Sequence, residues 1–182
     1  MLKDLLYKVA IRSVSGEMSL NINKVFTDSR NVVPGSCFIA VKGSISDGHV
    51  YIDEAVNKGA RVIICENLSI EMRPGVTYVE VENSSYAAGI ISHNFYGEPS
   101  RNLKLVGITG TNGKTTIATL LFKLFCSLGY KCGLISTVKN QVGNKILEAT
   151  HTTPDALTLN KLLKQMKDEA CTHVFMECSS HA

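Results

Sequence analysis

Residues 109–116, which read TGTNGKTT, have the composition of a phosphate-binding loop. They lie between an apolar segment expected to form a strand, 103–108, and a segment with helical periodicity, which is the context that such a loop requires. Glycines let the backbone turn its amides toward phosphate oxygens, and the amino end of the following helix adds partial positive charge. The residues predicted to contact a nucleotide are Gly110, Thr111, Asn112, Gly113, Lys114, Thr115 and Thr116.

Two side chains of this loop carry the expected chemistry. Lys114 is predicted to reach the β- and γ-phosphates of ATP, and the Thr115 hydroxyl is a predicted ligand of Mg²⁺. The commonest loop form, GxxxxGK, would need glycine where Ile108 stands. A glycine-rich turn with an incidental lysine is the alternative. The combination of strand, glycines, Lys-Thr-Thr and helix favours nucleotide binding.

A single carboxylate, Glu177, stands at the carboxyl end of an expected parallel strand, 172–178. Open α/β sheets place their ligands at that edge. A carboxylate beside a phosphate loop is a plausible Mg²⁺ ligand, so Lys114 and Glu177 are the predicted catalytic residues, and Thr115 and Glu177 the predicted metal ligands. The alternative is a solvated glutamate at a strand end.

Two further polar segments admit a structural interpretation. Residues 28–30, Asp-Ser-Arg, are typical of a turn in which Asp28 caps backbone groups and Arg30 is solvated. Farther along, Thr153 is placed to be a helix N-cap, with Pro154 at the first helical position. At both places the residues alone favour the structural interpretation over a binding role.

The elements around these residues predict the α/β class. In residues 1–100, strand signals near 24–27, 37–41, 60–65 and 77–81 alternate with helical segments, which indicates a small α/β domain. The polar breaker Gly-Glu-Pro-Ser at 97–100 is the expected linker.

Residues 101–182 are expected to begin a P-loop-type parallel-sheet ATPase domain. Strands at 103–108, 131–136 and 172–178 alternate with helices, and a hairpin is expected at 138–148. The helix after the loop carries apolar residues that fall on one helical face: Ile117, Leu120, Leu121, Leu124, Phe125 and Leu128. In the second helix, which begins near residue 155, the residues expected to point inward are Leu159, Leu162, Leu163 and Met166.

Composition excludes several classes of protein. The chain has 182 residues, 45% of them hydrophobic and 19% charged, which is typical of folded domains and not of disordered chains. A net charge of +3 gives no support to a nucleic acid partner. The six cysteines lack metal-site spacing and are expected to be reduced, and no export signal or membrane segment is evident, so a cytoplasmic location is expected.

Four separated motifs resemble those of the Mur ligases, which build the peptide of bacterial peptidoglycan. They are TDSR at 27–30 with VPG and FIA shortly after it, GITGTNGKTT at 107–116, HTTP at 151–154 and MECSSHA at 176–182. Their order and spacing are similar to those of the branch that adds the third amino acid of the peptide. The resemblance covers essentially the whole chain.

This resemblance implies a substrate-binding role for residues that the sequence alone leaves uncertain. It implies a domain at 1–100 that binds the UDP-sugar and the first part of a central ATP-binding domain at 101–182. The residues that it assigns to the UDP-linked muramoyl dipeptide are Thr27, Ser29, Ser44, Ile45, Ser46, His151, Thr152, Thr153 and Ser179. The resemblance also implies ATP and Mg²⁺ as cofactors, small-molecule substrates and a monomer, with no nucleic acid or membrane partner.

The implied reaction is amide formation through an acyl phosphate. The D-glutamyl carboxylate of UDP-N-acetylmuramoyl-L-Ala-D-Glu attacks the γ-phosphate of ATP, and the amine of diaminopimelate or lysine then displaces phosphate. The family's carboxylated lysine and carboxyl-terminal domain, which selects the amino acid, have no counterpart in the sequence. We therefore expect an amino-terminal fragment that is inactive alone.

Three alternatives stay open at this point. The chain could belong to a different Mur ligase, or to a folylpolyglutamate synthetase-like ligase of the same superfamily. The motif at 27–30 and the loop at 44–49 argue against the folate branch, which lacks that leading domain. The third alternative is a nucleotide-sugar-binding module without catalytic activity.

Overall fold

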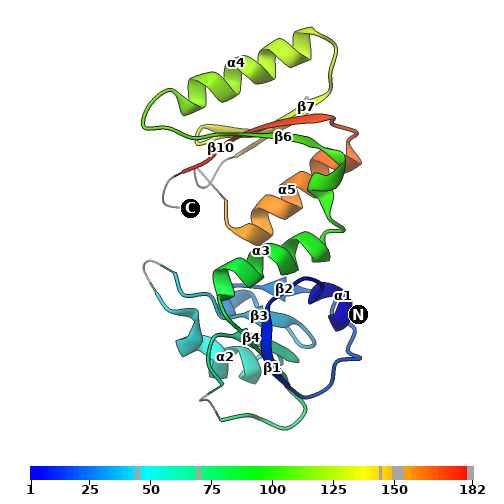
Figure 1. Cartoon of the computed structure of the whole chain (residues 1–182), viewed down its shortest axis with the longest axis vertical. Helices are drawn as coiled ribbons and strands as arrows, with labels where there is room; N and C mark the ends of the chain where they lie inside the picture. Colours follow the sequence, from blue (N-terminus) through cyan, green and yellow to red (C-terminus); the bar gives the residue numbers. More distant parts are fainter. Residues whose placement is uncertain (44–45, 69–70, 144, 149–153, 180–182) are drawn as a thin grey trace. The chain divides into compact units, whose positions relative to one another are not determined.

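The computed structural model of the chain describes residues 1–43, 46–68, 71–143, 145–148 and 154–179. It divides into two compact units, unit 1 at Met1–Phe95 and unit 2 at Tyr96–Ala182. Each unit contains one five-stranded sheet with helices packed on it (Figure 1). The α/β class expected from the sequence is therefore confirmed.

Unit 1 is built on a mostly parallel sheet with the strand order β1-β5-β4-β3-β2. Strands β2 to β5 are parallel to their neighbours, and β1 pairs antiparallel with β5. The strands are β1 at Ile11–Ser15, β2 at Val25–Phe26, β3 at Cys37–Ile39, β4 at Val62–Cys65 and β5 at Thr77–Val81. The helices are α1 at Leu2–Leu5, α2 at Ile52–Asn57 and α3 at Ser84–Phe95.

Apolar residues of β3 and β4 explain why this sheet is central to unit 1. Phe38 and Ile63 pack with Ile52 and Ala55 of α2 in one buried cluster. Because side chains alternate along a strand, Ile39 points to the opposite face, and it too is fully buried. Strands that are apolar on both faces are typical of parallel sheets covered on both sides.

Unit 2 has the strand order β6-β10-β7-β8-β9, so the last strand in sequence lies between the first two. Strands β6, β10 and β7 are parallel, and the β8–β9 hairpin expected from the sequence extends the sheet antiparallel to β7. The elements are β6 at Lys104–Ile108, α4 at Lys114–Ser127, β7 at Cys132–Ile135, β8 at Lys139–Val142, β9 at Lys145–Glu148, α5 at Ala156–Asp168 and β10 at His173–Glu177.

Helices α4 and α5 cover opposite faces of this sheet (Figure 1). Ala118 and Phe122 of α4 pack with Phe175 of β10, whereas Leu163 and Met166 of α5 pack in a separate cluster with other sheet residues. The inward face predicted for α5 is thus confirmed.

The described part of the chain also contains short 3-10 turns: η1 at Ser29–Asn31, η2 at Gly48–Tyr51 and η3 at Pro99–Asn102.

The apolar stripe on α4 does not coincide with the face that packs on the sheet. Four of its six residues are more than 45% exposed: Ile117, Leu120, Leu124 and Leu128. Helix α4 instead packs through Ala118 and Phe122, with Leu121 and Phe125 partly buried beside them. Periodicity finds the apolar side of a helix, but this stripe is wider than the surface that the sheet offers.

No helix in the described part of the chain has the length and apolar character needed to cross a bilayer.

Packing between β7 and α5 leaves no room for a side chain at Gly133. A Cβ there would overlap the sulfur of Met166, which is fully buried. We expect Gly133→Ala to lower the free energy of unfolding of unit 2 by about 1–3 kcal/mol, a typical cost of overpacking. Urea or thermal unfolding measures this change.

Gly89→Ala in α3 is the matched control, because a Cβ there meets no other atom within 4 Å. That substitution should be neutral or stabilising by up to about 1 kcal/mol, since alanine is the better helix former. Met166→Ala should cost less in the Gly133→Ala background than in the original chain. Equal costs in both backgrounds would show that the two residues do not compete for space.

Candidate functional site

The predicted phosphate loop connects β6 to α4 and depends on glycine at two positions. Gly110 and Gly113 have φ angles of 145° and 81°, a region that other residues rarely adopt. Gly113 is the N-cap of α4, so the helix begins at Lys114 directly after the loop. Among the loop side chains, those of Thr111, Asn112 and Thr116 are exposed. The loop therefore presents the open amino end of a 14-residue helix.

Lys114 folds back over the loop that precedes it. Its Nζ donates a hydrogen bond to the carbonyl of Gly110 at 2.8 Å and lies 3.5 Å from the carbonyl of Thr111. An ammonium group has three donors, so it can bind a further acceptor without leaving the loop. This arrangement places a positive charge beside the helix end, where both favour an anion.

The carboxylate of Glu177 is buried at the carboxyl end of β10, with only 1% of the residue exposed. Its Oε2 accepts a hydrogen bond from the Thr115 hydroxyl at 3.0 Å and from the Thr137 hydroxyl at 3.0 Å. Its Oε1 accepts one from the Thr137 amide at 3.1 Å. The alternative interpretation, a solvated glutamate at a strand end, is therefore wrong, because this side chain is buried.

Parallel pairing explains why these residues meet. Glu177 pairs with Ile108 at the end of β6, and Met176 pairs with Ile135 at the end of β7. The exits of the three strands therefore lie at one edge, where β6 leads into the loop and α4, and β7 leads into Thr137. Thr137 is the residue that sequence reasoning missed, because a threonine after a strand carries no motif of its own.

The geometry of Thr115 and Glu177 fits a magnesium ion. Mg²⁺ binds oxygen at about 2.0–2.1 Å in an octahedron, so two neighbouring ligand oxygens lie about 2.9 Å apart. Thr115 Oγ1 and Glu177 Oε2 are 3.0 Å apart. Within the described residues there is no cluster of three or more His, Cys, Asp or Glu side chains suited to a metal. A cation here would thus need phosphate and water oxygens as its other ligands, the usual situation for Mg²⁺ with nucleotides.

Several predicted substrate residues can be placed only in part. Ser179 follows Glu177 by two residues, and the intervening Cys178 amide donates to the Ile108 carbonyl at 2.8 Å, which holds this segment beside the loop. Ser46 accepts a hydrogen bond through its carbonyl from the Gly43 amide at 3.0 Å. The residues that lie outside the described part of the chain are Ser44, Ile45, His151, Thr152 and Thr153.

The N-cap of α5 differs from the one expected. The cap is Asp155, whose carboxylate accepts hydrogen bonds from the amides of Leu157 and Thr158, and not Thr153. Pro154 accordingly precedes the cap and does not occupy the first helical position. A short carboxylate satisfies two free amides and interacts favourably with the helix dipole, which explains why the cap lies two residues later.

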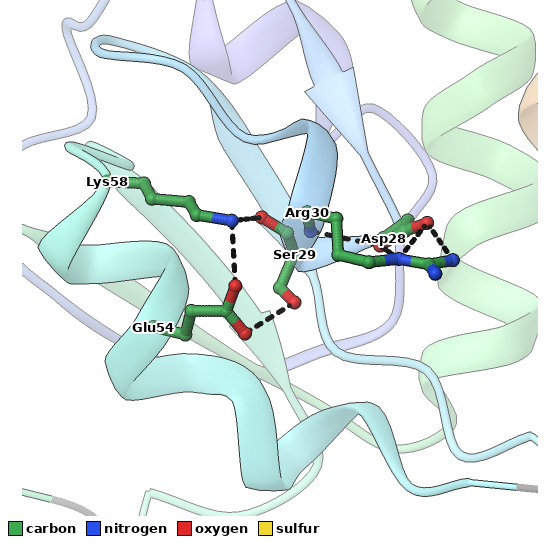
Figure 2. Close-up of polar contacts among 5 residues, drawn as sticks. All are labelled: Asp28, Ser29, Arg30, Glu54 and Lys58. Carbon is green, nitrogen blue, oxygen red and sulfur yellow. Dashed lines mark hydrogen bonds and ion pairs between the residues drawn. The ribbon is translucent and has the colours of Figure 1, made fainter.

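In unit 1, the segment at 28–30 forms the turn that its residues favour (Figure 2). The Asp28 carboxylate accepts a hydrogen bond from the Arg30 amide at 2.9 Å and pairs with the Arg30 guanidinium at 2.8 Å. The side-chain hydrogen bond from Arg30 lowers the pKa of Asp28. Arg30 is 83% exposed, so the structural interpretation of the turn is confirmed.

Ser29 faces away from this ion pair, toward α2 (Figure 2). Its hydroxyl donates to Glu54 at 2.9 Å, and its carbonyl accepts a hydrogen bond from Lys58 at 3.1 Å. Lys58 also pairs with Glu54 at 2.7 Å, and hydrogen bonds from Lys58 and Ser29 lower the pKa of Glu54. Ser29 therefore ties η1 to α2. Its contact with substrate, like that of the half-buried Thr27, stays a prediction.

The segment after residues 44–46 is fixed by Asp47 and His49. Asp47 Oδ1 accepts a hydrogen bond from the His49 amide at 2.9 Å and lies 2.6 Å from His49 Nδ1. The Glu66 amide donates to His49 Nε2 at 2.9 Å, so the ring proton is on Nδ1, facing Asp47. His49 therefore joins this segment to the exit of β4.

Comparison with known proteins places these features in a family. A profile of the Mur ligase family catalytic domain matches residues 21–96, and a profile of the Mur ligase middle domain matches residues 108–182. The chain belongs to the Mur ligase family. The first range ends one residue beyond unit 1, and the second lies within unit 2.

Two curated relatives of this Mur ligase chain share a name. A UDP-N-acetylmuramoyl-L-alanyl-D-glutamate--2,6-diaminopimelate ligase from Cytophaga hutchinsonii is 54% identical over 182 residues. The protein of the same name from Alkaliphilus metalliredigens is 40% identical over 181 residues. Both matches cover 100% of this chain but only 37% and 36% of the relatives, so the chain spans little more than a third of their length.

Solved structures agree with this assignment. The structure of a UDP-N-acetylmuramoyl-L-alanyl-D-glutamate--2,6-diaminopimelate ligase matches with a TM-score of 0.70 and 26% identity, over 92% of this chain and 34% of that one. A MurF ligase from Thermotoga maritima in complex with ADP has a TM-score of 0.55 and 24% identity, over 85% of this chain and 31% of its own. The second likeness concerns the fold alone.

The Glu66 carboxylate at the start of α3 makes the stability of unit 1 sensitive to acid. It accepts hydrogen bonds from the Ser84 amide and hydroxyl, both at 2.8 Å, and these bonds lower the pKa of Glu66. The resulting stabilisation is complete above the pKa of an unfolded glutamate, about 4.3, and is lost as the pH falls through the lower folded pKa. Glu66→Gln should cost about 1 kcal/mol of unfolding free energy at pH 7 and less at pH 3.

Chemical unfolding at the two pH values measures this difference. The matched control is Glu71→Gln at an exposed position, which should change the free energy little at either pH. A loss for Glu66→Gln that is equal at pH 7 and pH 3 would contradict the assigned role of the ionised carboxylate.

Proposed function

We propose that this chain supplies the substrate-binding and nucleotide-binding parts of an ATP-dependent ligase. The enzyme would add diaminopimelate, as the third amino acid of the peptide, to UDP-N-acetylmuramoyl-L-Ala-D-Glu in peptidoglycan synthesis. The names of the curated relatives support this substrate pair. In this proposal, residues 1–100 bind the UDP-sugar and residues 101–182 bind ATP, and the protein is a cytoplasmic monomer.

One arrangement carries the proposal. Lys114 and Thr115 open α4, and Thr115 is hydrogen-bonded to the buried Glu177 at the same edge of the parallel sheet. A positive side chain, a helix amino end and a hydroxyl–carboxylate pair with the spacing of magnesium ligands are what a nucleoside triphosphate with its cation requires. A turn that served only to connect β6 with α4 would need neither the lysine nor the hydroxyl–carboxylate pair.

The role of each group follows from the charges in the reaction. When the substrate carboxylate attacks the γ-phosphate of ATP, negative charge is transferred to the leaving ADP. Lys114 and the amide groups of the loop would hold and neutralise the β- and γ-phosphates, and Thr115 and Glu177 would hold Mg²⁺. The cation, when bound, supplies further neutralisation of the phosphate oxygens.

The acyl phosphate then reacts with the amine of the incoming amino acid. The amine forms the C–N bond and loses a proton, and phosphate departs with the electrons of the broken C–O bond. The chain's contribution is to hold the substrate and nucleotide in position, which favours the first step by proximity. Because the chain spans about 37% of its relatives, we expect it to bind both ligands but not to complete ligation alone.

Replacing Lys114 with alanine tests the nucleotide site. Isothermal titration calorimetry of the 182-residue chain should show ATP affinity falling about 10- to 100-fold, the equivalent of one charged hydrogen bond. Affinity for UDP-N-acetylmuramoyl-L-Ala-D-Glu should not change. Lys123→Ala, at an exposed position of α4, is the matched control and should leave both affinities unchanged.

Activity is tested in a chimera in which the carboxyl-terminal part of the Cytophaga hutchinsonii relative completes this chain. Ligation of diaminopimelate should be abolished by Lys114→Ala, and near-normal turnover would refute the role of this lysine. Binding of the UDP-sugar by the chain, with no affinity for ATP, would favour the alternative of a nucleotide-sugar-binding module.

A further inference from the structure

Thr137 makes two of the three hydrogen bonds described above for the Glu177 carboxylate, one from its amide to Oε1 and one from its hydroxyl to Oε2. Both carboxylate oxygens are thus held by one residue, which fixes the plane of the carboxylate as well as its position. A buried carboxylate is costly unless donors surround it, so these bonds stabilise Glu177 in its buried position.

The third donor, Thr115, differs from Thr137 because its own oxygen is a predicted metal ligand. Oε2 accepts from both hydroxyl groups, and a carboxylate oxygen has about two lone pairs for such contacts. A cation bound between Thr115 and Glu177 would take up one of those lone pairs. The Thr115 hydroxyl would then turn its lone pair to the cation, whereas the bonds from Thr137 could persist.

We propose that Thr137 is the positioning residue of the metal site: it holds the Glu177 carboxylate with one oxygen beside Thr115, ready for the cation that accompanies the nucleotide. This inference rests on the proposed function and adds to it a residue that acts through the Glu177 carboxylate. Partners that orient a metal ligand in this way typically change metal affinity by 10- to 100-fold when removed.

The position of Thr137 allows its side chain to be replaced without disturbing the core. The residue is exposed and lies outside the helices and strands, directly after β7 and Ser136, so its replacement removes no core packing. Thr137→Val keeps the shape of the side chain and the backbone amide but loses the hydroxyl donor. Thr137→Ser restores that donor, and Thr137→Ala removes it without adding an apolar group.

The experiment measures ATP affinity of the 182-residue chain by calorimetry twice, once with excess Mg²⁺ and once in EDTA. For Thr137→Val and Thr137→Ala we expect affinity with Mg²⁺ to fall about 10-fold, and affinity in EDTA to change less than about twofold. Thr137→Ser should stay within about threefold of the original chain under both conditions. Direct titration with Mn²⁺ in the presence of ADP, followed by electron paramagnetic resonance, should show the same order.

Thr172→Val is the matched control, since Thr172 lies just before the opposite end of β10 and its hydroxyl is 3.4 Å from the Lys131 carbonyl. It should change neither affinity. Thermal unfolding of every variant separates loss of the site from loss of the fold, and Thr137→Ala serves if the valine variant does not fold.

Each result is decisive. Equal losses with Mg²⁺ and in EDTA, or a serine variant as weak as the valine variant, would overturn the positioning role. If the original chain binds ATP with a dependence on Mg²⁺ and Thr137→Val does the same, only the role of Thr137 falls. If the original chain binds no nucleotide under either condition, the proposed function falls and takes this inference with it.

Discussion

The burial of one carboxylate at the edge of a parallel sheet is the constraint on which unit 2 depends. Glu177 is almost fully removed from solvent, so its charge has to be balanced by donors that the fold brings to it. Its donors include Thr115, in the first turn of α4, and Thr137, which follows β7. Because β10 lies between β6 and β7 and is parallel to both, the segments that follow these two strands meet at the carboxyl end of β10. The strand order of unit 2 therefore determines which donors surround Glu177.

Local signals explain why part of this site could be predicted from the sequence. The phosphate loop is contiguous, so its glycines, Lys114 and the following helix can be read from ten neighbouring residues, and Glu177 was recognised because it ends an apolar strand. Thr137 and His49 could not be found in this way. Each acts on a partner that is 40 or 17 positions away, and those pairings exist only once the strands have assembled. The loop was predictable as a motif, but the hydrogen bonds from Thr137 that hold the predicted metal ligand Glu177 were not.

The same distinction accounts for one local prediction that was wrong, the N-cap of α5, and for the exposure of α4 residues that periodicity alone does not reveal. The apolar stripe of α4 marks a side of the helix, yet residues such as Leu120 and Leu124 are exposed, and the helix packs on the sheet through Ala118 and Phe122. At α5, Thr153 satisfied the general preference for an N-cap, but Asp155 competes for the same role and its carboxylate accepts from two amides. In both cases the pattern identified the helix correctly. Packing on the sheet then determined which residues of α4 are buried, and competition between neighbouring residues determined which one caps α5.

Binding of the nucleotide and of its cation should be coupled by the composition of this site. One carboxylate and one hydroxyl are too few ligands to hold Mg²⁺ tightly, and within the described residues no richer cluster of metal-binding side chains exists. Phosphate oxygens would complete the coordination, so each ligand would raise the affinity for the other by the same factor. A preformed carboxylate raises the affinity for the cation, because Glu177 is already ordered before either ligand arrives. The hydrogen bonds that make a buried glutamate tolerable in the folded chain are thus also the ones that would make it an effective ligand.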